Sequence, residues 1–221
     1  YISIQGTIDD KAVNKQGYVI DSLELCLDGI DNEGTGKYNP NATVWKDLSG
    51  NNRNGILENM DNSWNDYGLY FDGIDDYVPI AEMNYDNVTL ESVISRPENA
   101  KVGGHIISNI EAGGYMLYID GNTGKIGFGV YINEKQAYEF SVGAQGVIQP
   151  NKSYSISASY DGERMVGIAS GNSIYNQKNL IGTIGKTQNN TMIMLGPNPS
   201  RNLPTGEYYN GTIYSTRIYS K

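Results

Sequence analysis

The side chains that most often carry out covalent chemistry are scarce in this chain. Its 221 residues include one histidine, His105, and one cysteine, Cys26. A serine or cysteine nucleophile needs a neighbouring base, and no serine here lies in a nucleophile elbow. His105 instead begins a predicted strand after Gly103-Gly104, where an exposed or hydrogen-bonded role is expected. Cys26, between two leucines, is predicted to be a buried, unreactive thiol. One histidine and one cysteine also supply too few ligands for zinc.

Two groups of carboxylates could bind a hard cation. Calcium takes oxygen ligands, roughly six to eight of them, and the chain places acidic residues on two predicted loops. These candidate ligands are Asp28 and Asp31 in the first loop and Asp72, Asp75 and Asp76 in the second. Neither group has the spacing of an EF-hand. The sequence therefore predicts a structural Ca²⁺ at one of these loops or, alternatively, Asx turns and hairpin caps at both.

The elements that must position these side chains are β-strands. The chain has 27 glycines and 18 tyrosines but only 7 prolines, which favours strands joined by tight turns over helices. Large side chains recur at every second position in residues 23–27, 88–94, 126–132 and 154–160. About a dozen such strands with no crossover helix predict an all-β fold, a jelly-roll sandwich of two antiparallel sheets.

Two segments are predicted to be hairpins. In residues 69–80, apolar alternation enters the turn at Asp72-Gly73 and resumes at Tyr77. Residues 154–160 and 164–169 flank a second turn at Asp161-Gly162. Asp-Gly tolerates the positive φ angles that many tight turns need.

Residues 126–132 carry an unusual pattern, because Gly127 and Gly129 alternate with large apolar side chains. One face of this strand is therefore packed and the other is bare. A glycine in a strand indicates that another group approaches closely. A neighbouring loop or sheet is the expected occupant, with a ligand as the alternative.

Several segments together resemble one family. They are W-K-D-L-S-G-N-N-R-N-G at residues 45–55, L-Y-F-D-G at 69–73, Y-S-I-S-A-S-Y-D-G at 154–162 and Y-N-G-T-I-Y-S-T-R-I-Y at 209–219. Their residues and order are similar to the laminin-G-like (LamG) jelly-roll domains of the concanavalin A-like lectin/glucanase superfamily, in the type found on bacterial surfaces and phage. The resemblance covers residues 23 to 221 and implies a two-sheet β-sandwich.

The resemblance also implies kinds of site. Many LamG relatives bind calcium on loops, and sugar recognition in the superfamily relies on aromatic rings that stack on pyranose faces. The aromatic residues on predicted loops or strand starts are Trp64, Tyr67, Tyr208 and Tyr209, the predicted ligand-binding residues. Core packing is the alternative explanation for each of them.

The related glucanases place their catalytic carboxylates on one strand as E-x-D-x-x-E, and this chain lacks that pattern. Glu134 and Glu139, five residues apart, would point to opposite faces of a regular strand. No catalytic residue is predicted, although a pair from distant strands remains an alternative.

Charge and hydropathy limit the kinds of partner that this chain could bind. The formal net charge of −9 and the pI near 4.6 disfavour nucleic acid and anionic membrane surfaces, because phosphate binding normally needs a basic face. No apolar run is long enough for a membrane span. Residues 1–22 are expected to be a linker or the end of a preceding module, which makes an upstream domain an expectation, and residues 23–221 the folded domain.

The leading hypothesis is a non-catalytic recognition module that binds carbohydrate or a surface protein. The resemblance implies display on a bacterial surface or a phage tail, hence an extracellular, cell-surface or virion location. The alternatives are a glycoside hydrolase or polysaccharide lyase with an unrecognised site, and a structural spacer domain.

Overall fold

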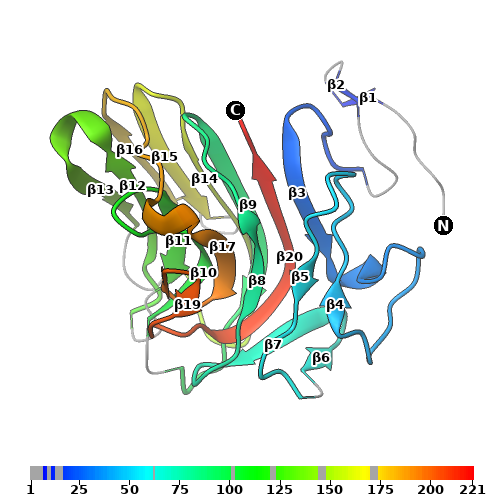
Figure 1. Ribbon diagram of the computed structural model, residues 1–221. Coiled ribbons are helices and arrows are strands. Elements are labelled where there is room, and N and C mark those ends of the chain that lie inside the picture. The colour runs from blue at the N-terminus through cyan, green and yellow to red at the C-terminus, as the bar shows by residue number, and fades with distance from the viewer. Residues whose placement is uncertain are drawn as a thin grey trace.

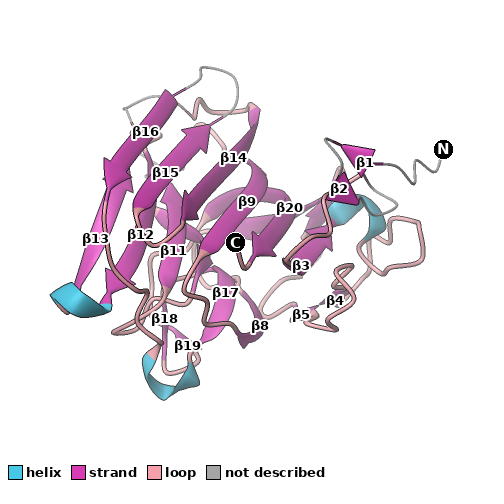
Figure 2. Ribbon diagram, turned by 90° about the horizontal axis from the view of Figure 1, so that it is seen from above, coloured by secondary structure: helices cyan, strands magenta, loops and turns pink. Residues whose placement is uncertain are grey.

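Two antiparallel sheets packed face to face form the body of the structure, a computed structural model that describes residues 7–8, 11–12, 17–61, 63–100, 103–119, 123–143, 148–169 and 174–221 (Figures 1 and 2). The six-stranded sheet has the order β13-β12-β11-β10-β17-β8. Its strands are β8 (Val78–Glu82), β10 (Gly104–Ser108), β11 (Tyr115–Ile119), β12 (Ile126–Ile132), β13 (Ala137–Val142) and β17 (Met192–Gly196). These two layers confirm the predicted jelly-roll β-sandwich.

The eight-stranded sheet has the order β16-β15-β14-β9-β20-β7-β6, with β3 also paired to β20. Its strands are β3 (Leu23–Asp28), β6 (Trp64–Asn65), β7 (Gly68–Asp72), β9 (Val88–Ser95), β14 (Ser153–Tyr160), β15 (Arg164–Ala169), β16 (Ile174–Asn179) and β20 (Asn210–Tyr219). The predicted β14–β15 hairpin is confirmed, with Tyr160 opposite Met165. The closing strand β20 lies inside the sheet, between β9 and the pair β3 and β7.

Short elements complete the described chain. Three two-stranded ribbons pair β1 (Thr7–Ile8) with β2 (Lys11–Ala12), β4 (Val44–Trp45) with β5 (Gly55–Ile56), and β18 (Pro199–Ser200) with β19 (Leu203–Pro204). The described helices are single turns of 3₁₀ helix, η1 (Gly29–Asp31), η2 (Asn133–Lys135) and η3 (Gln188–Asn190). None of these turns has the length or apolarity to cross a bilayer.

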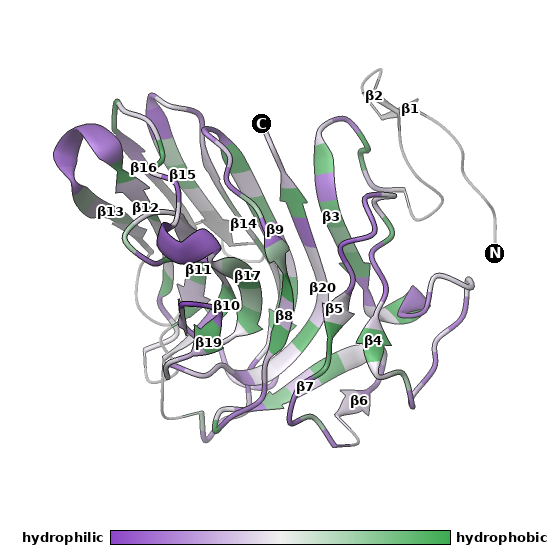
Figure 3. Cartoon of the chain, viewed as in Figure 1, coloured by the Kyte–Doolittle hydropathy of each residue, from purple (hydrophilic) through white to green (hydrophobic). Residues whose placement is uncertain are grey.

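The core lies between the two sheets and follows the alternation of the sequence. In β9, Val88, Leu90, Ser92 and Ile94 are buried, whereas the residues that alternate with them are half-buried. Figure 3 shows the same pattern, with hydrophobic residues along the strands and hydrophilic residues along many of the connecting loops. Period-two burial of one strand face is what a sandwich requires.

The predicted hairpin at residues 69–80 is wrong. β7 pairs with β20 and β6 in the eight-stranded sheet, while β8 pairs with β17 in the other sheet. The Asp-Gly turn is therefore a corner that carries the chain between layers. It is closed by side-chain caps, because the Asp72 carboxylate accepts from the Ile74 N–H and the Asp76 carboxylate accepts from the Asp72 N–H. Local turn chemistry is similar for a hairpin and a corner, and only the strand partners distinguish them.

The segment that follows β4 is organised by one buried carboxylate. Asp47 is 5% exposed and accepts four hydrogen bonds, from the backbone N–H groups of Cys26, Ser49 and Arg53 and from the Ser49 hydroxyl, at 2.8–3.0 Å. These bonds join the loop to β3. The tryptophan two residues earlier, Trp45, is fully buried against Trp64, with ring centroids 5.1 Å apart. The W-x-D-L-S-G segment is thus a structural loop.

Residues 17–22 lie against the sandwich. The Tyr18 hydroxyl donates to Asp28, and the Arg217 guanidinium lies 4.0 Å above the Tyr18 ring. Ser220 N–H donates to the Ser22 carbonyl near the chain's end. Residues 1–6, 9–10 and 13–16 of the predicted linker lie outside the described residues, so a linker over residues 1–22 stays a prediction.

Cys26 lies on β3 and is fully buried, as its flanking leucines predict. Burial is the main cause that raises the pKa of its thiol to about 12. The positive charge of Arg217 lowers this pKa, and the nearby carboxylates of Asp28 and Asp47 raise it further. The thiol is therefore protonated at neutral pH and unreactive.

Candidate ligand-binding groove

An open groove of about 660 Å³ lies on the outer face of the six-stranded sheet. Its floor comes from β10, β11 and β13, and one side comes from the segment that includes β18 and β19. The described residues that line it are Gly103, His105, Ile110, Glu111, Ala112, Met116, Tyr118, Tyr138, Phe140, Asn198, Pro199, Ser200, Thr205 and Glu207. A volume of this size is within the usual range of ligand sites.

Aromatic rings cover one part of this groove. Tyr138 and Phe140 are two residues apart on β13, so both point to the outer face, and their ring centroids lie 6.4 Å apart with planes tilted by 41°. Phe140 is 43% exposed. Tyr118 on β11 lies on the same face and is half-buried. The three rings form an aromatic surface of the kind on which a sugar ring stacks.

The bare face of β12 makes room for these rings. Gly127 pairs with Tyr118 and Gly129 pairs with Phe140 across the sheet. A Cβ atom at Gly127 would lie 1.9 Å from the Tyr118 ring, and one at Gly129 would lie 2.8 Å from the Phe140 ring. The predicted close approach is therefore made by side chains of the neighbouring strands, which lie over the two glycines.

A histidine–glutamate pair forms the polar end of the groove. His105, 4% exposed, donates from Nε2 to Glu207 Oε2 at 3.2 Å, and its backbone N–H donates to the Glu207 carbonyl at 3.1 Å. Asn198 Nδ2 donates to the same carboxylate oxygen at 3.0 Å. The hydrogen bond from His105 is the main cause that lowers the pKa of Glu207. This carboxylate is consequently ionised at neutral pH.

The backbone takes an uncommon conformation at two residues that line the groove. Glu207 has φ of 50° and Ala112 has φ of 47°. The left-handed region is costly for residues other than glycine and recurs at functional sites. His105 Nδ1 is buried and has no hydrogen-bond partner among the described residues. Such a group costs stability, and a role in binding is one explanation for retaining it.

The sequence did not predict this groove. His105 was expected to be a strand-end side chain, and Tyr118, Tyr138, Phe140 and Glu207 were not predicted as ligand-binding residues. The available signal was the glycine face of β12, which predicted that another group approaches this strand closely. Its meaning depended on strand order, because Tyr118 and Phe140 reach the two glycines only through pairing on either side of β12.

Two of the predicted stacking residues, Trp64 and Tyr209, belong to the core. Trp64 is 8% exposed, and its Nε1 donates to the Ala42 carbonyl. Tyr209 is 1% exposed, and its hydroxyl donates to the Ser95 carbonyl. Neither ring has a free face for a sugar, so core packing, the alternative reading, accounts for both.

The other two predicted residues are accessible but lie outside the groove. Tyr67 is 54% exposed at the turn between β6 and β7, beside Tyr38 with ring centroids 4.9 Å apart. It lines a second depression of about 340 Å³ that Tyr18, Val93 and Tyr214 also line. Tyr208 is half-buried next to Glu207. Ligand binding by Tyr67 and Tyr208 stays a prediction.

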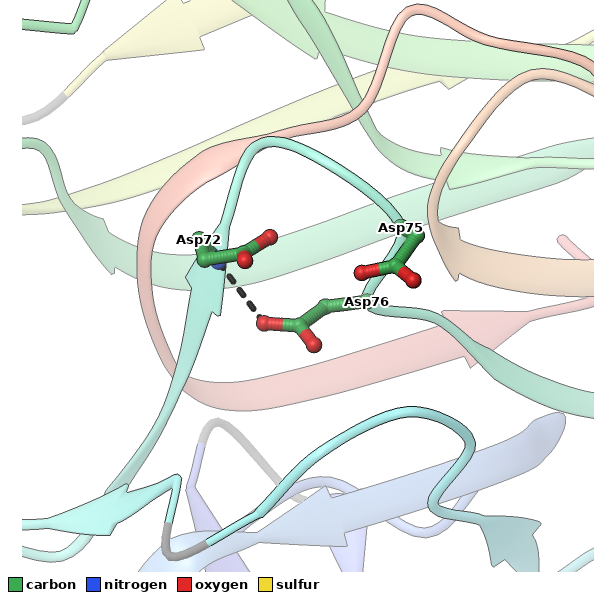
Figure 4. Close-up of side chains that lie close together, drawn as sticks. All are labelled: Asp72, Asp75 and Asp76. Carbon is green, nitrogen blue, oxygen red and sulfur yellow. Dashed lines mark hydrogen bonds between the residues drawn. The ribbon is translucent and has the colours of Figure 1, made fainter.

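Asp72, Asp75 and Asp76 come together at the corner between the sheets (Figure 4), with one carboxylate oxygen from each within 4.8 Å of the others. Asp76 is 4% exposed, and burial is the main cause that raises the pKa of its carboxyl to about 6, to which the charges of Asp72 and Asp75 contribute. Oxygen ligands with excess negative charge suit calcium. These three residues would hold the predicted ion. Its positive charge would offset their negative charges and so stabilise the corner.

The other predicted calcium ligands serve as caps. Asp28 accepts from the Ile30 N–H at 2.9 Å and from the Tyr18 hydroxyl, and Asp31 accepts from the Gly36 N–H at 2.7 Å. Within the described part of the chain, the corner cluster is the one group of at least three acidic, histidine or cysteine side chains close enough to share an ion. Asx-type capping, the alternative reading, describes Asp28 and Asp31.

The raised pKa of Asp76 gives a pH dependence. Its folded-state pKa of about 6 lies above the ordinary value of 3.8, so the folded state binds this proton more tightly than the unfolded state. The stability contributed by protonation is complete below about pH 4 and is lost as the pH rises through about 6. We expect Asp76→Asn, which keeps an oxygen for the Asp72 N–H, to stabilise the protein by about 1 kcal/mol at pH 7.5 and by much less at pH 4.

Thermal denaturation at both pH values measures this effect, and an equal change at the two values would contradict it. The same experiment tests calcium. If the corner binds Ca²⁺, adding millimolar CaCl₂ at pH 7.5 raises the melting temperature of the unsubstituted protein over an EDTA control, and raises that of Asp76→Asn much less. No response to CaCl₂ in the unsubstituted protein would argue against the ion.

Solved structures share this architecture. A carbohydrate-binding module, CBM40, of the Ruminococcus gnavus IT-sialidase, bound to α2,3-sialyllactose, superposes with a TM-score of 0.58 and 11% identity, covering 70% of this chain and 90% of that one. The binding domain of botulinum neurotoxin serotype D/C superposes with a TM-score of 0.60 and 16% identity, and the match covers 91% of this chain and 49% of that one. Domains LG4-5 of the mouse laminin α1 chain superpose with a TM-score of 0.53 and 16% identity, and the match covers 68% of this chain and 40% of that one.

These likenesses show the fold, a jelly-roll β-sandwich. This chain spans about half the length of the toxin binding domain and less of the laminin fragment. No protein-family model and no curated protein sequence matches it.

Proposed function

We propose that this protein is a recognition module of the LamG-like, concanavalin A-like kind that binds carbohydrate in the groove over the six-stranded sheet. The main support is that one open groove combines an aromatic surface with an ionised hydrogen-bond acceptor. The surface consists of Tyr118, Tyr138 and Phe140, and the acceptor is Glu207. Aromatic rings contact the apolar face of a sugar, and carboxylates and amides bind its hydroxyls. Neither contact requires a reaction.

Structures with the same fold support this proposal. The CBM40 neighbour is described bound to α2,3-sialyllactose, and a botulinum neurotoxin DC binding domain is described in complex with rat synaptotagmin II. A protein ligand is therefore the second candidate, favoured by the accessible Tyr67 and Ile30, which line the second depression. Display on a bacterial surface or a phage tail, downstream of another domain, completes the proposal.

Paired alanine substitutions test which face binds. We expect Phe140→Ala to lower the affinity for a glycan found by array screening about tenfold, because it removes a ring from the groove. Tyr67→Ala removes a ring of similar exposure from the second depression and should leave this affinity unchanged. Isothermal titration calorimetry measures both.

The reverse result, a loss with Tyr67→Ala alone, would move the site to the second depression. An array and titrations that find no glycan ligand would contradict carbohydrate binding. Cleavage of a bound polysaccharide, measured as new reducing ends or unsaturated products, would replace the recognition role by the hydrolase or lyase alternative.

A further inference from the structure

The acidic side chains outnumber the basic ones along the lining of the groove. Among its described lining residues, the groove has two carboxylates, Glu111 and Glu207, and no lysine or arginine. The chain as a whole carries a net charge of −9. An anionic ligand would therefore enter a negative site with no described cation lining it to offset its charge.

Glu207 adds a chemical restriction to this charge. Its Oε2 is occupied by His105 and Asn198, while Oε1 accepts no hydrogen bond from the described part of the chain, and the side chain is 62% exposed. An ionised carboxylate only accepts hydrogen bonds. The ligand atom that meets Oε1 must be a donor, such as a hydroxyl.

The carboxylate is held in this orientation from two sides. His105 binds both the side chain and the backbone carbonyl of Glu207, which fixes the residue in its left-handed conformation. His105 is itself buried, so it cannot swing towards solvent to follow a different ligand. The acceptor at the polar end is thus preorganised, which lowers the ordering cost of binding.

We infer that the groove selects uncharged, hydroxyl-rich glycans and rejects acidic ones, with Glu207 as the specificity-determining residue. This inference rests on the proposed function, because it names the ligand class of the same groove. Like charges a few ångströms apart repel more strongly near a protein surface than in bulk water. We expect a sugar acid to bind at least about tenfold more weakly than its neutral counterpart. The ligand class would thus differ from the sialyllactose of the CBM40 neighbour.

Matched probes test this selection. The array should carry neutral hexasaccharides derived from cellulose, mannan, chitin and galactan beside hexagalacturonate, and lactose beside α2,3-sialyllactose. We expect binding to neutral members alone. The affinity for the best neutral probe should be the same at 50 and 500 mM NaCl, whereas residual binding of an acidic probe should strengthen at the higher salt as repulsion is screened.

Two variants separate charge from shape. Glu207→Gln keeps the size of the side chain and removes its charge, so the affinity for acidic probes should rise about tenfold while that for the neutral probe falls. Glu163→Gln removes an exposed charge that does not line the groove and should change neither affinity.

The outcomes are distinguishable. Preferred binding of hexagalacturonate or sialyllactose that Phe140→Ala weakens would overturn the selection and leave the carbohydrate-binding proposal intact. Binding of no probe at all would overturn both. Unchanged discrimination in Glu207→Gln would overturn the role given to Glu207.

Discussion

Asp47→Ala is expected to lower the free energy of unfolding by about 4 kcal/mol. The substitution removes the acceptor of four hydrogen bonds and leaves three backbone N–H groups without their partner. The N–H of Cys26 lies in a fully buried residue, so water cannot replace the carboxylate there. Each unsatisfied buried donor costs about 1–3 kcal/mol. The loop and strand β3 would lose their connection.

Urea denaturation of the unsubstituted protein and of Asp47→Ala measures this loss of stability. Asp86→Ala is the matched control, because Asp86 is exposed and its carboxylate makes no hydrogen bond within the described residues; its expected change is below about 0.5 kcal/mol. A loss below about 1 kcal/mol for Asp47→Ala would show that the four bonds exchange freely with water. The W-x-D-L-S-G segment would then need another explanation.

Gly127→Ala is expected to abolish most glycan binding while the protein stays folded. The new Cβ would lie 1.9 Å from the Tyr118 ring, closer than any real contact, so the ring must leave its place over β12. A side chain can swing away at modest cost, whereas backbone could not. Loss of this ring from the groove should weaken binding of an array-identified glycan at least about thirtyfold, equivalent to about 2 kcal/mol.

Gly167→Ala provides the control for the glycine-to-alanine change itself. Gly167 lies in β15 of the other sheet, and a Cβ there would meet nothing within 4 Å. It should leave binding unchanged and stability equal or slightly higher. Retained binding in Gly127→Ala, with the circular dichroism spectrum of the unsubstituted protein, would remove Tyr118 from the proposed site.

The fold could be predicted because its signal is local and repeated. Burial at every second residue of β9, and the hairpin of β14 and β15, follow from side-chain type and turn chemistry within a few residues. The buried Cys26 follows from its neighbours in the same way. Period-two alternation has this strength because one sheet face must be dry.

The candidate groove could not be predicted, because its parts are far apart in the chain. His105, Tyr118, Phe140 and Glu207 come from four segments that strand pairing and a loop contact bring together. With 18 tyrosines in the sequence, residue type alone does not separate a groove tyrosine from a core one. Predicted loop position selected Trp64 and Tyr209, which the structure buries.

The sequence by itself determined that this chain forms paired antiparallel layers, and that another group would approach the bare glycine face of residues 126–132. Only the tertiary structure decided that Asp72-Gly73 turns the chain from one sheet to the other, and which rings cover Gly127 and Gly129. The physical reason is that alternation and turn chemistry act within a few residues, whereas the partner of a strand is set by the packing of all strands together.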